Sequence, residues 1–484
     1  MSNVRSSILF SFAGKYGSKL INLVSTIFIA RLLTPTEIGT FAIASSVVMI
    51  LAEIRLLGAT AYLVREESID EQKIRKAYGI TFLMCWGLAF LLIIGAGSIA
   101  DFFNQPNLQG VFIILASNFF LAPYISIPNA ILARNYLFKQ ITIIGLVALI
   151  IQLFATLLLI NADFGYYALA WGQLAAMISR MILSLYFTRH TQVYCPSFHG
   201  IAEIAKLGIF TSAANIVRRI HYTISDIVIG KMGTPAEVGI FSRGMGYVDF
   251  ISQSVLDGVG SVAQPYMSDM QRRGNDIAQA YIKATALLCS LVWPVLVVAG
   301  FSALPAIRLL FGNQWDTASP IASALSFWMC IKVMSFFSPP VLIAVGREAA
   351  MFKRDVALFI LLLVSLTFSY PLGLTAMALT FIFNGIAEVC ITLWLLRVTV
   401  QLSVKACLMS LGKPVLVAIC CFSVTVLLDF IYPFNDGSPL LIFLLLAVLM
   451  PPLWLLLTKW LKLQIYFEVT NVLQAASKRI IRRS

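Results

Sequence analysis

Charged residues are scarce in this sequence: only 12% of its 484 residues are Asp, Glu, Lys or Arg. It contains no G-x-x-x-x-G-K-[ST] motif, which excludes ATP hydrolysis by a P-loop within this chain. It also contains no H-E-x-x-H motif and only three histidines, so we expect no metal site. The eight cysteines form no C-x-x-C pair, which argues against a disulfide framework or a zinc site. We therefore predict a protein without a cofactor.

Apolar residues are correspondingly abundant, at 60% of the chain, and the mean hydropathy is +0.89. A soluble protein of this length could not bury so much apolar surface. Apolar segments of about 20 residues recur along the chain, and each is long enough to cross a ~30 Å hydrocarbon core. We predict an all-α polytopic membrane protein with about 14 transmembrane helices. The predicted spans are 8–30, 38–63, 77–99, 109–129, 140–160, 165–188, 204–230, 238–265, 280–301, 318–343, 355–372, 374–396, 405–428 and 438–458.

Positive charges are distributed unevenly between the two sides of these predicted spans. Twenty-three of the 35 Lys and Arg residues lie on the side of the N-terminus, whereas only Arg31, Lys231 and Arg308 lie on the opposite side. Because Lys and Arg are enriched in cytoplasmic loops, we predict that both termini are cytoplasmic. The formal charge of +13 then needs no nucleic acid to explain it. We expect the basic tail to lie on an anionic leaflet as an interfacial helix.

One stretch of the sequence occurs twice. Residues 8–41 recur at 208–241 without a gap. Six spans precede the second copy, so both copies enter the membrane in the same direction and the repeat is parallel. We predict two six-helix lobes around a central cavity, with two further helices outside the repeat. The expected parts are an N-terminal lobe at 1–200, a C-terminal lobe at 201–400, helices 13–14 at 401–460 and a basic amphipathic tail at 461–484.

Each copy contains a Thr-Pro-x-Glu segment, at Thr34 to Glu37 and at Thr234 to Glu237. In such a segment Thr is suited to the N-cap of a helix, Pro to its first turn and Glu to the third position of a capping box. We therefore assign this segment an architectural role in both copies.

A polar stripe precedes each of these helix starts. Ser11, Lys15, Lys19, Asn22 and Thr26 share one face of a predicted helix, and Thr211, Asn215, Arg219, Tyr222 and Asp226 occupy the equivalent positions. Lys19 and Arg219 would lie roughly 15–20 Å into their spans. An ionised side chain at that depth costs at least ~2.5–3.5 kcal/mol unless it faces water, a counter-charge or a ligand. We predict that both stripes face the cavity.

Cationic residues outnumber acidic ones inside the predicted spans, and this surplus favours an anionic cargo. Arg and Lys both bind phosphate, Arg through bidentate hydrogen bonds and Lys as a point charge. The predicted anion-binding residues are Lys15, Lys19, Arg55, Arg218, Arg219, Arg243 and Lys332. Candidates for a proton or coupling-ion site are Asp249, Glu388 and Glu53. For any one of these residues, a structural ion pair is the alternative explanation.

An ordered set of short motifs extends from about residue 5 to residue 355. The motifs are Ala30-Arg31-Leu32-Leu33-Thr34-Pro35-x-Glu37-x-Gly39, Phe138-Lys139, Leu309-Leu310-Phe311-Gly312-Asn313-Gln314-Trp315, Gly346-Arg347 and Phe352-Lys353. In these motifs the chain resembles the oligosaccharide flippases of the multidrug/oligosaccharidyl-lipid/polysaccharide exporter superfamily. Within that superfamily it is similar to the branch that serves colanic acid and succinoglycan-type exopolysaccharides.

The resemblance implies a cargo, a mechanism and a location. The cargo would be an oligosaccharide carried on undecaprenyl diphosphate, moved by alternating access across the bacterial cytoplasmic (inner) membrane. The diphosphate would be the anion that binds to Lys19, Arg55, Arg218 and Arg219. Helices 13–14 would help form a groove for the polyprenyl tail. Proteins that polymerise and export the polysaccharide would be candidate partners.

Two other functions remain open at the level of sequence. The first is a cation-coupled drug or metabolite antiporter of the same superfamily, which would require a net acidic cavity to bind cationic drugs. A membrane glycan polymerase or glycosyltransferase is disfavoured, because the longest predicted outer loop, at about 302–317, is too short to house a catalytic region. We therefore predict that the chain is not an enzyme.

Overall fold

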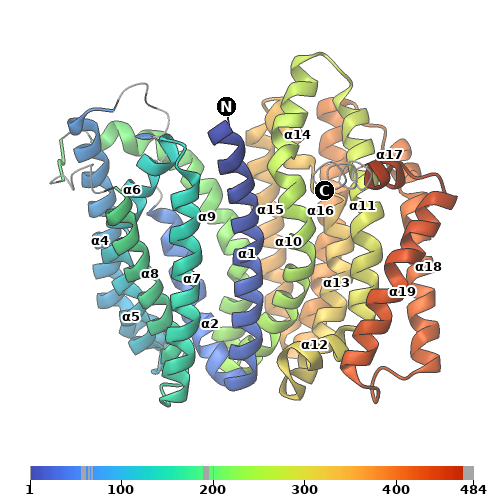
Figure 1. Ribbon diagram of the computed structural model, residues 1–484, viewed down its shortest axis with the longest axis horizontal. Coiled ribbons are helices and arrows are strands. Elements are labelled where there is room, and N and C mark those ends of the chain that lie inside the picture. The colour runs from blue at the N-terminus through green and yellow to red at the C-terminus, as the bar shows by residue number, and fades with distance from the viewer. Residues whose placement is uncertain are drawn as a thin grey trace. The chain divides into compact units, whose positions relative to one another are not determined.

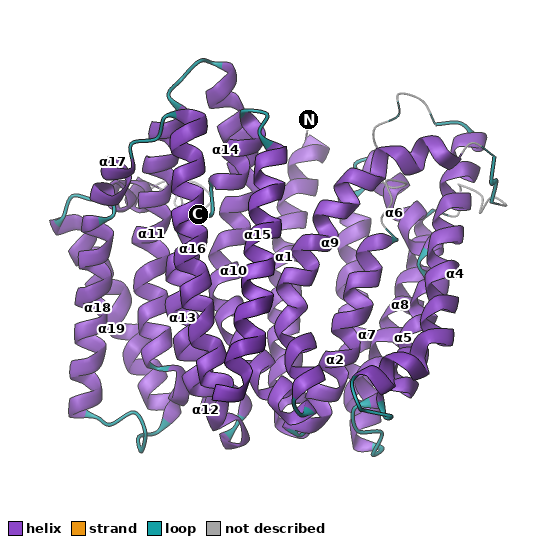
Figure 2. Cartoon of the chain, turned by 180° about the vertical axis from the view of Figure 1, so that it is seen from behind, coloured by secondary structure: helices purple, strands orange, loops and turns teal. Residues whose placement is uncertain are grey.

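The computed structural model describes residues 2–55, 62–63, 66, 69–188, 196–199 and 201–471, and for residues 2–13 and 201–215 it describes the backbone. The described residues form helices joined by turns and loops, and no strand occurs among them (Figure 2). The chain divides into two compact units, Met1–Ile240 and Phe241–Ser484, which we call the N-terminal unit and the C-terminal unit.

The N-terminal unit consists of long helices that pack side by side. Its helices are α1 (Ser2–Leu32), α2 (Pro35–Ile54), α4 (Glu71–Phe102), α5 (Leu108–Leu121), α6 (Pro123–Arg134), α7 (Phe138–Asn161), α8 (Tyr167–Phe187) and α9 (Ile201–Met232). Helix α7 packs against α1 and α8, α4 packs against α5, and α2 packs against α5 and α9 (Figure 1). Fully buried side chains such as Phe112 and Leu115 of α5 fill the space between them.

The C-terminal unit is built in the same manner. It holds most of α10 (Pro235–Arg272), followed by α11 (Ile277–Phe301), α12 (Ala303–Phe311), η1 (Asn313–Ala318), α13 (Ser319–Val333), α14 (Ser338–Ala344), α15 (Glu348–Ser369), η2 (Tyr370–Leu372), α16 (Leu374–Val400), α17 (Val404–Ser410), α18 (Gly412–Ile431) and α19 (Pro439–Trp460). Helix α11 packs against α13 and α18, and α16 packs against α13 and α15 (Figure 1). The indole of Trp454 in α19 donates to the carbonyl oxygen of Ser290 in α11 at 2.9 Å.

The all-α polytopic prediction is confirmed in the described part of the chain. Ten helical segments there are long and apolar enough to cross a membrane, and the bent pair α5 and α6 would be an eleventh. The other three predicted spans fall on α1, α9 and α10, which have 31, 32 and 38 residues. These three helices carry the polar stripes and several of the internal charges, which lowers their hydropathy.

Three predicted spans are interrupted: the span at 405–428 breaks at Leu411 between α17 and α18, and proline explains the other two breaks. The span predicted at 109–129 bends by 43° between α5 and α6, where Pro123 occupies the first turn of α6. The span predicted at 318–343 breaks before α14, which begins with Ser338-Pro339-Pro340. Proline lacks the N–H that would continue the preceding helix and disfavours helical backbone in the residue before it.

Several expectations concern residues that lie outside the described ones. These are residues 56–61 at the end of the second predicted span and residues 472–484 of the basic tail. The predicted lobe boundary at residue 200 stays a prediction. Helix α9, which carries the second polar stripe, packs against α2 and α4 and so belongs to the N-terminal unit.

Candidate functional site

The two Thr-Pro-x-Glu segments form the capping boxes that the sequence predicts. The Glu37 side chain accepts a hydrogen bond from the Thr34 backbone N–H at 2.8 Å, and the Thr34 hydroxyl accepts one from the Glu37 N–H at 3.3 Å. Glu237 and Thr234 repeat both bonds at the same distances. These polar groups satisfy the free N–H groups of the helix start, and the architectural role is confirmed.

Glycines bring these two helix starts into direct backbone contact within the N-terminal unit. A Cβ atom on Gly39 would overlap the carbonyl oxygen of Pro235, and one on Gly239 would overlap the carbonyl oxygen of Pro35. The contact is therefore reciprocal between the two copies. Small residues permit this kind of close helix approach in membrane proteins.

The polar stripe of α9 contacts α2 through two side chains. Arg219 donates from Nε and Nη2 to Oε1 of Glu53 at 3.0 and 2.7 Å, and these side chains are 37% and 14% exposed. Nearby, the Ser46 hydroxyl donates to Oδ2 of Asp226 at 3.0 Å. The structural alternative thus applies to Arg219 and to Glu53, because each neutralises the other in this conformation.

The remaining stripe residues lie at or near the surface of the N-terminal unit. Lys15, Asn22 and Tyr222 are exposed, as is Arg218 beside the second stripe, whereas Lys19 is half-buried. Their roles in anion binding stay predictions. The side chains of Ser11, Thr211 and Asn215 lie outside the described ones.

Arg55 lies at the C-terminal end of α2, in a different environment from Arg219. Its Nε atom is buried and has no hydrogen-bond partner. The same is true of Nε in Arg180, on α8, which packs against α2. The two guanidinium groups are close enough to interact electrostatically. The structure therefore brings together two cations from spans that are far apart in the sequence.

In the C-terminal unit, Arg243 of α10 is held by aromatic rings. Its guanidinium carbon lies 5.8 Å from the ring centroid of Phe311 and 5.5 Å from that of Trp315, while its buried Nε has no hydrogen-bond partner. Cation–π attraction compensates part of the cost of burying this charge. Asp249, on the same helix, is buried.

Lys332 and Glu388 occur in one cluster with two charged residues of α15. The Lys332 ammonium lies 4.5 Å from the Trp328 ring centroid and, like Arg354, attracts the Glu388 carboxylate. Arg354 is only 7% exposed and donates to Asp355 through Nε and Nη2, at 3.0 and 2.8 Å. The four side chains form a balanced set of two cations and two anions, which we call the C-terminal charge cluster.

Arg354 also anchors this cluster to the neighbouring helices. Its Nη1 donates to the hydroxyl of Ser338 in α14 at 2.7 Å and to that of Thr392 in α16 at 3.2 Å. Arg354 lies between the predicted spans at 318–343 and 355–372, where a loop charge is expected, whereas the structure buries it. The adjacent Arg354-Asp355 pair was the signal that could have indicated a buried ion pair.

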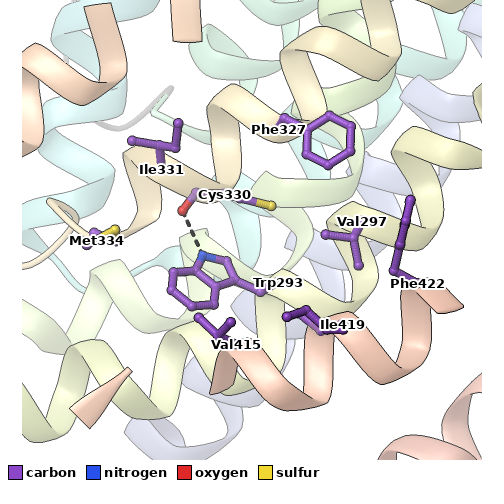
Figure 3. Close-up of a pocket in the computed structure, with 10 residues that line it drawn as sticks. Trp293, Val297, Phe327, Cys330, Ile331, Met334, Val415, Ile419 and Phe422 are labelled. Atoms are coloured by element: carbon purple, nitrogen blue, oxygen red, sulfur yellow. Dashed lines mark hydrogen bonds between the residues drawn. The ribbon is translucent and has the colours of Figure 1, made fainter. Parts of the chain in front are cut away.

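An apolar groove of about 380 Å³ lies in the C-terminal unit between α11, α13 and α18 (Figure 3). Trp293 and Val297 of α11 face Phe327 of α13, and the Trp293 indole donates to the carbonyl oxygen of Cys330 at 2.7 Å. Helix α18 contributes Val415, Ala418, Ile419 and Phe422. All ten lining residues are apolar, so the groove can accept a hydrocarbon chain and has no side-chain charge for a polar headgroup.

Metal-binding groups do not gather anywhere in the described part of the chain, where no three or more His, Cys, Asp or Glu side chains form a cluster that could hold an ion. The features that could act on a ligand are therefore the buried cations, the C-terminal charge cluster and the apolar groove. None of them contains a nucleophile paired with a base.

Comparison with known proteins identifies the family. The model of a polysaccharide biosynthesis protein family matches residues 28–320, which is more than half of the chain. The chain belongs to this polysaccharide biosynthesis family.

Two curated relatives match most of the chain. The teichuronic acid biosynthesis protein TuaB of Bacillus subtilis is 24% identical over 412 residues, covering 82% of this chain and 83% of its own. The succinoglycan biosynthesis transport protein ExoT of Rhizobium meliloti is 22% identical over 349 residues, covering 72% and 71%.

Two solved structures share the fold of this chain. The lipid II flippase MurJ in an inward closed conformation matches with a TM-score of 0.73 at 16% identity, over 94% of this chain and 98% of its own. A multidrug resistance transporter of the MATE family, in an inward-facing conformation, matches with a TM-score of 0.61 at 14% identity, over 79% and 94%. This member of the polysaccharide biosynthesis family is thus a multi-pass membrane protein that shares its fold with these two solved structures.

Proposed function

We propose that this protein is a flippase for undecaprenyl-diphosphate-linked oligosaccharide repeat units, used in the synthesis of a surface polysaccharide. It would move its cargo by alternating access from the cytoplasmic to the outer leaflet of a bacterial inner membrane, with both of its termini in the cytoplasm. The observation that carries the proposal is membership of a polysaccharide biosynthesis family combined with a lipid-flippase fold over 94% of the chain. The match to the multidrug transporter covers a smaller share of this chain, 79%, than the match to the lipid flippase does. This difference favours a lipid-linked cargo over a soluble drug.

The charges support the diphosphate part of this cargo. Lys15, Lys19, Arg55 and Arg218 lie in the N-terminal unit, in which Arg219 is the cation that Glu53 neutralises. A membrane protein retains buried or intramembrane cations at a cost, so a surplus of them is explained by an anionic ligand. Diphosphate provides the acceptor oxygens that Arg and Lys bind.

The apolar groove supports the polyprenyl part. Its volume of about 380 Å³ is in the lower part of the ~300–1,000 Å³ range of ligand pockets, so it can hold a section of a long chain. One wall comes from α18, which corresponds to the first of the two helices outside the repeat. We assign to this groove the section of the lipid tail nearest the C-terminal unit.

The experiment that tests this function is a gene deletion followed by lipid analysis. We expect surface polysaccharide to disappear and diphosphate-linked oligosaccharide to accumulate in the cytoplasmic leaflet, with restoration by the intact gene. If the strain instead becomes drug-sensitive while its glycans remain normal, the antiporter function replaces this proposal. If purified protein elongates a lipid-linked glycan, the chain is a polymerase and the flippase proposal is wrong.

A further inference from the structure

Arg55 and Arg180 have an arrangement that none of the described residues of their unit explains. They come from α2 and α8, two helices that pack together, and each has a buried Nε atom without a hydrogen-bond partner. Their guanidinium groups repel one another. Leaving a buried charged donor unsatisfied costs more than leaving a neutral one, and like charges raise the cost further. Two such groups at one place indicate a missing partner of opposite charge.

The described acidic residues near the end of α2 are already engaged. Glu53, two residues before Arg55, accepts both hydrogen bonds of Arg219. Glu66 forms an ion pair with Lys73 at 2.6 Å, and Asp70 caps α4 by accepting from the Lys73 N–H at 2.7 Å. In the part of the chain that the structure describes, no carboxylate forms an ion pair with Arg55 or Arg180.

The chemistry of the missing partner follows from its two donors. A guanidinium group presents its N–H groups in a planar fork that fits the oxygen atoms of a phosphate, and Nε belongs to one side of that fork. Two forks around one site can bind several oxygens of a single phosphate group and neutralise its charge. A chloride ion would accept hydrogen bonds without using the planar geometry.

We propose that Arg55 and Arg180 together bind a phosphate group of an anionic lipid within the N-terminal unit. This inference assigns a binding role to Arg180, which the sequence alone marks only as a charge within a span. The lipid would be either the diphosphate-linked cargo or an anionic phospholipid of the membrane. The first source rests on the proposed function, whereas the second does not.

The test measures lipid binding to the purified full-length protein in detergent, by thermal unfolding and by direct titration. The probes are undecaprenyl diphosphate, phosphatidylglycerol and, as a lipid without phosphate, diacylglycerol. We expect at least one of the two phosphate-bearing lipids, and not diacylglycerol, to raise the unfolding temperature. Arg55→Gln and Arg180→Gln should each weaken that binding about tenfold or more, because each removes a charge-assisted hydrogen-bond donor.

Two further variants separate this site from a general loss of positive charge or of folding. Arg180→Lys keeps the charge without the fork and should bind more weakly than wild type and more strongly than Arg180→Gln. Arg397 is a cation at the end of α16 in the other unit, and the Arg397→Gln protein should bind the lipids as the wild-type protein does. Without lipid, the Arg55→Gln and Arg180→Gln proteins should unfold at or above the wild-type temperature, since each relieves the repulsion.

The outcomes distinguish this inference from the proposed function. If undecaprenyl diphosphate binds and both Gln variants lose it, the site belongs to the cargo. If only the binding of phosphatidylglycerol depends on Arg55 and Arg180, the site holds a membrane phospholipid. The deletion experiment alone then decides the flippase function. Unchanged binding of both lipids by Arg55→Gln and Arg180→Gln would overturn the inference even if polysaccharide export proceeds by the proposed route. Loss of stability in both variants without lipid would also overturn it, because the pair would then be structural.

Discussion

Arg354 in the C-terminal unit and the pair Arg55 and Arg180 in the N-terminal unit satisfy their guanidinium groups to opposite degrees. In the C-terminal unit, Arg354 has a partner for each of its three nitrogen atoms, and its charge is balanced within the C-terminal charge cluster. In the N-terminal unit, Arg55 and Arg180 repel one another and leave their buried Nε atoms without partners. A buried ion pair whose hydrogen bonds are all made holds helices in place. Buried cations without partners lower the stability of the fold, and an anionic ligand that binds them can restore it. The first arrangement is that of a structural element and the second that of a binding site.

The largest effect should come from the same substitution made in each unit. Arg354→Gln leaves the partly buried carboxylates of Asp355 and Glu388 with one cation fewer, and removing one partner of a fully buried pair typically costs about 3–5 kcal/mol, which is the upper end of the expected loss. We expect a large fall in the unfolding temperature and a low yield of folded protein. Arg180→Gln should lower neither quantity. Similar losses from the two substitutions would remove the distinction between the two sites.

Substitution of the glycines at the two helix starts should give the next largest loss of stability, and both of these positions lie in the N-terminal unit. Gly39→Ala and Gly239→Ala place a methyl group against a backbone carbonyl that cannot rotate away, and overpacking of this kind costs about 1–3 kcal/mol. Gly87→Ala in α4 is the control, because no atom lies within 4 Å of the position that its added Cβ would take, and alanine favours the helix. Thermal unfolding of the purified variants checks this.

The reciprocity of that contact can be tested separately. Because both glycines occupy the same interface, the double variant should lose less stability than the sum of the two single losses. Strict additivity would mean that the two copies do not share one contact in the folded protein.

The C-terminal charge cluster offers a third measurement, on the pair Lys332 and Glu388. A double-mutant cycle with Lys332→Gln and Glu388→Gln should give a favourable coupling of about 0.5–3 kcal/mol, since the two groups attract one another. Export of polysaccharide by Glu388→Gln is the second readout. Normal export at wild-type protein levels would remove Glu388 from the candidates for a coupling site, and loss of export with a stable protein would support that role.

Sequence patterns predicted the helices more fully than the charges. Apolar runs and capping signals depend on neighbouring residues, so the spans and the starts at Thr34 and Thr234 could be predicted from local sequence. The pairing of Arg219 with Glu53 joins residues 166 positions apart, and no local pattern contains that information. Arg354 resembled a loop charge because it follows Lys353 closely, and only the packing of α15 against α14 and α16 buries it. Arg180 became a candidate only when the fold placed it beside Arg55.

The smallest predicted effect concerns the feature that the two copies share most closely. Thr34→Ala and Thr234→Ala each remove one capping hydrogen bond at an exposed helix start, which typically costs about 1 kcal/mol. The two losses should be equal within error, because the backbone capping bonds have the same lengths and equivalent partners in both copies, and export should continue. Thr36→Ala, an exposed residue of the first copy whose side chain neither capping box uses, is the matched control and should unfold as wild type does. If one Thr variant abolishes export while the other leaves it intact, that copy of the segment has a function beyond capping. The two helix starts would then differ in function, as the charged residues of the two copies do.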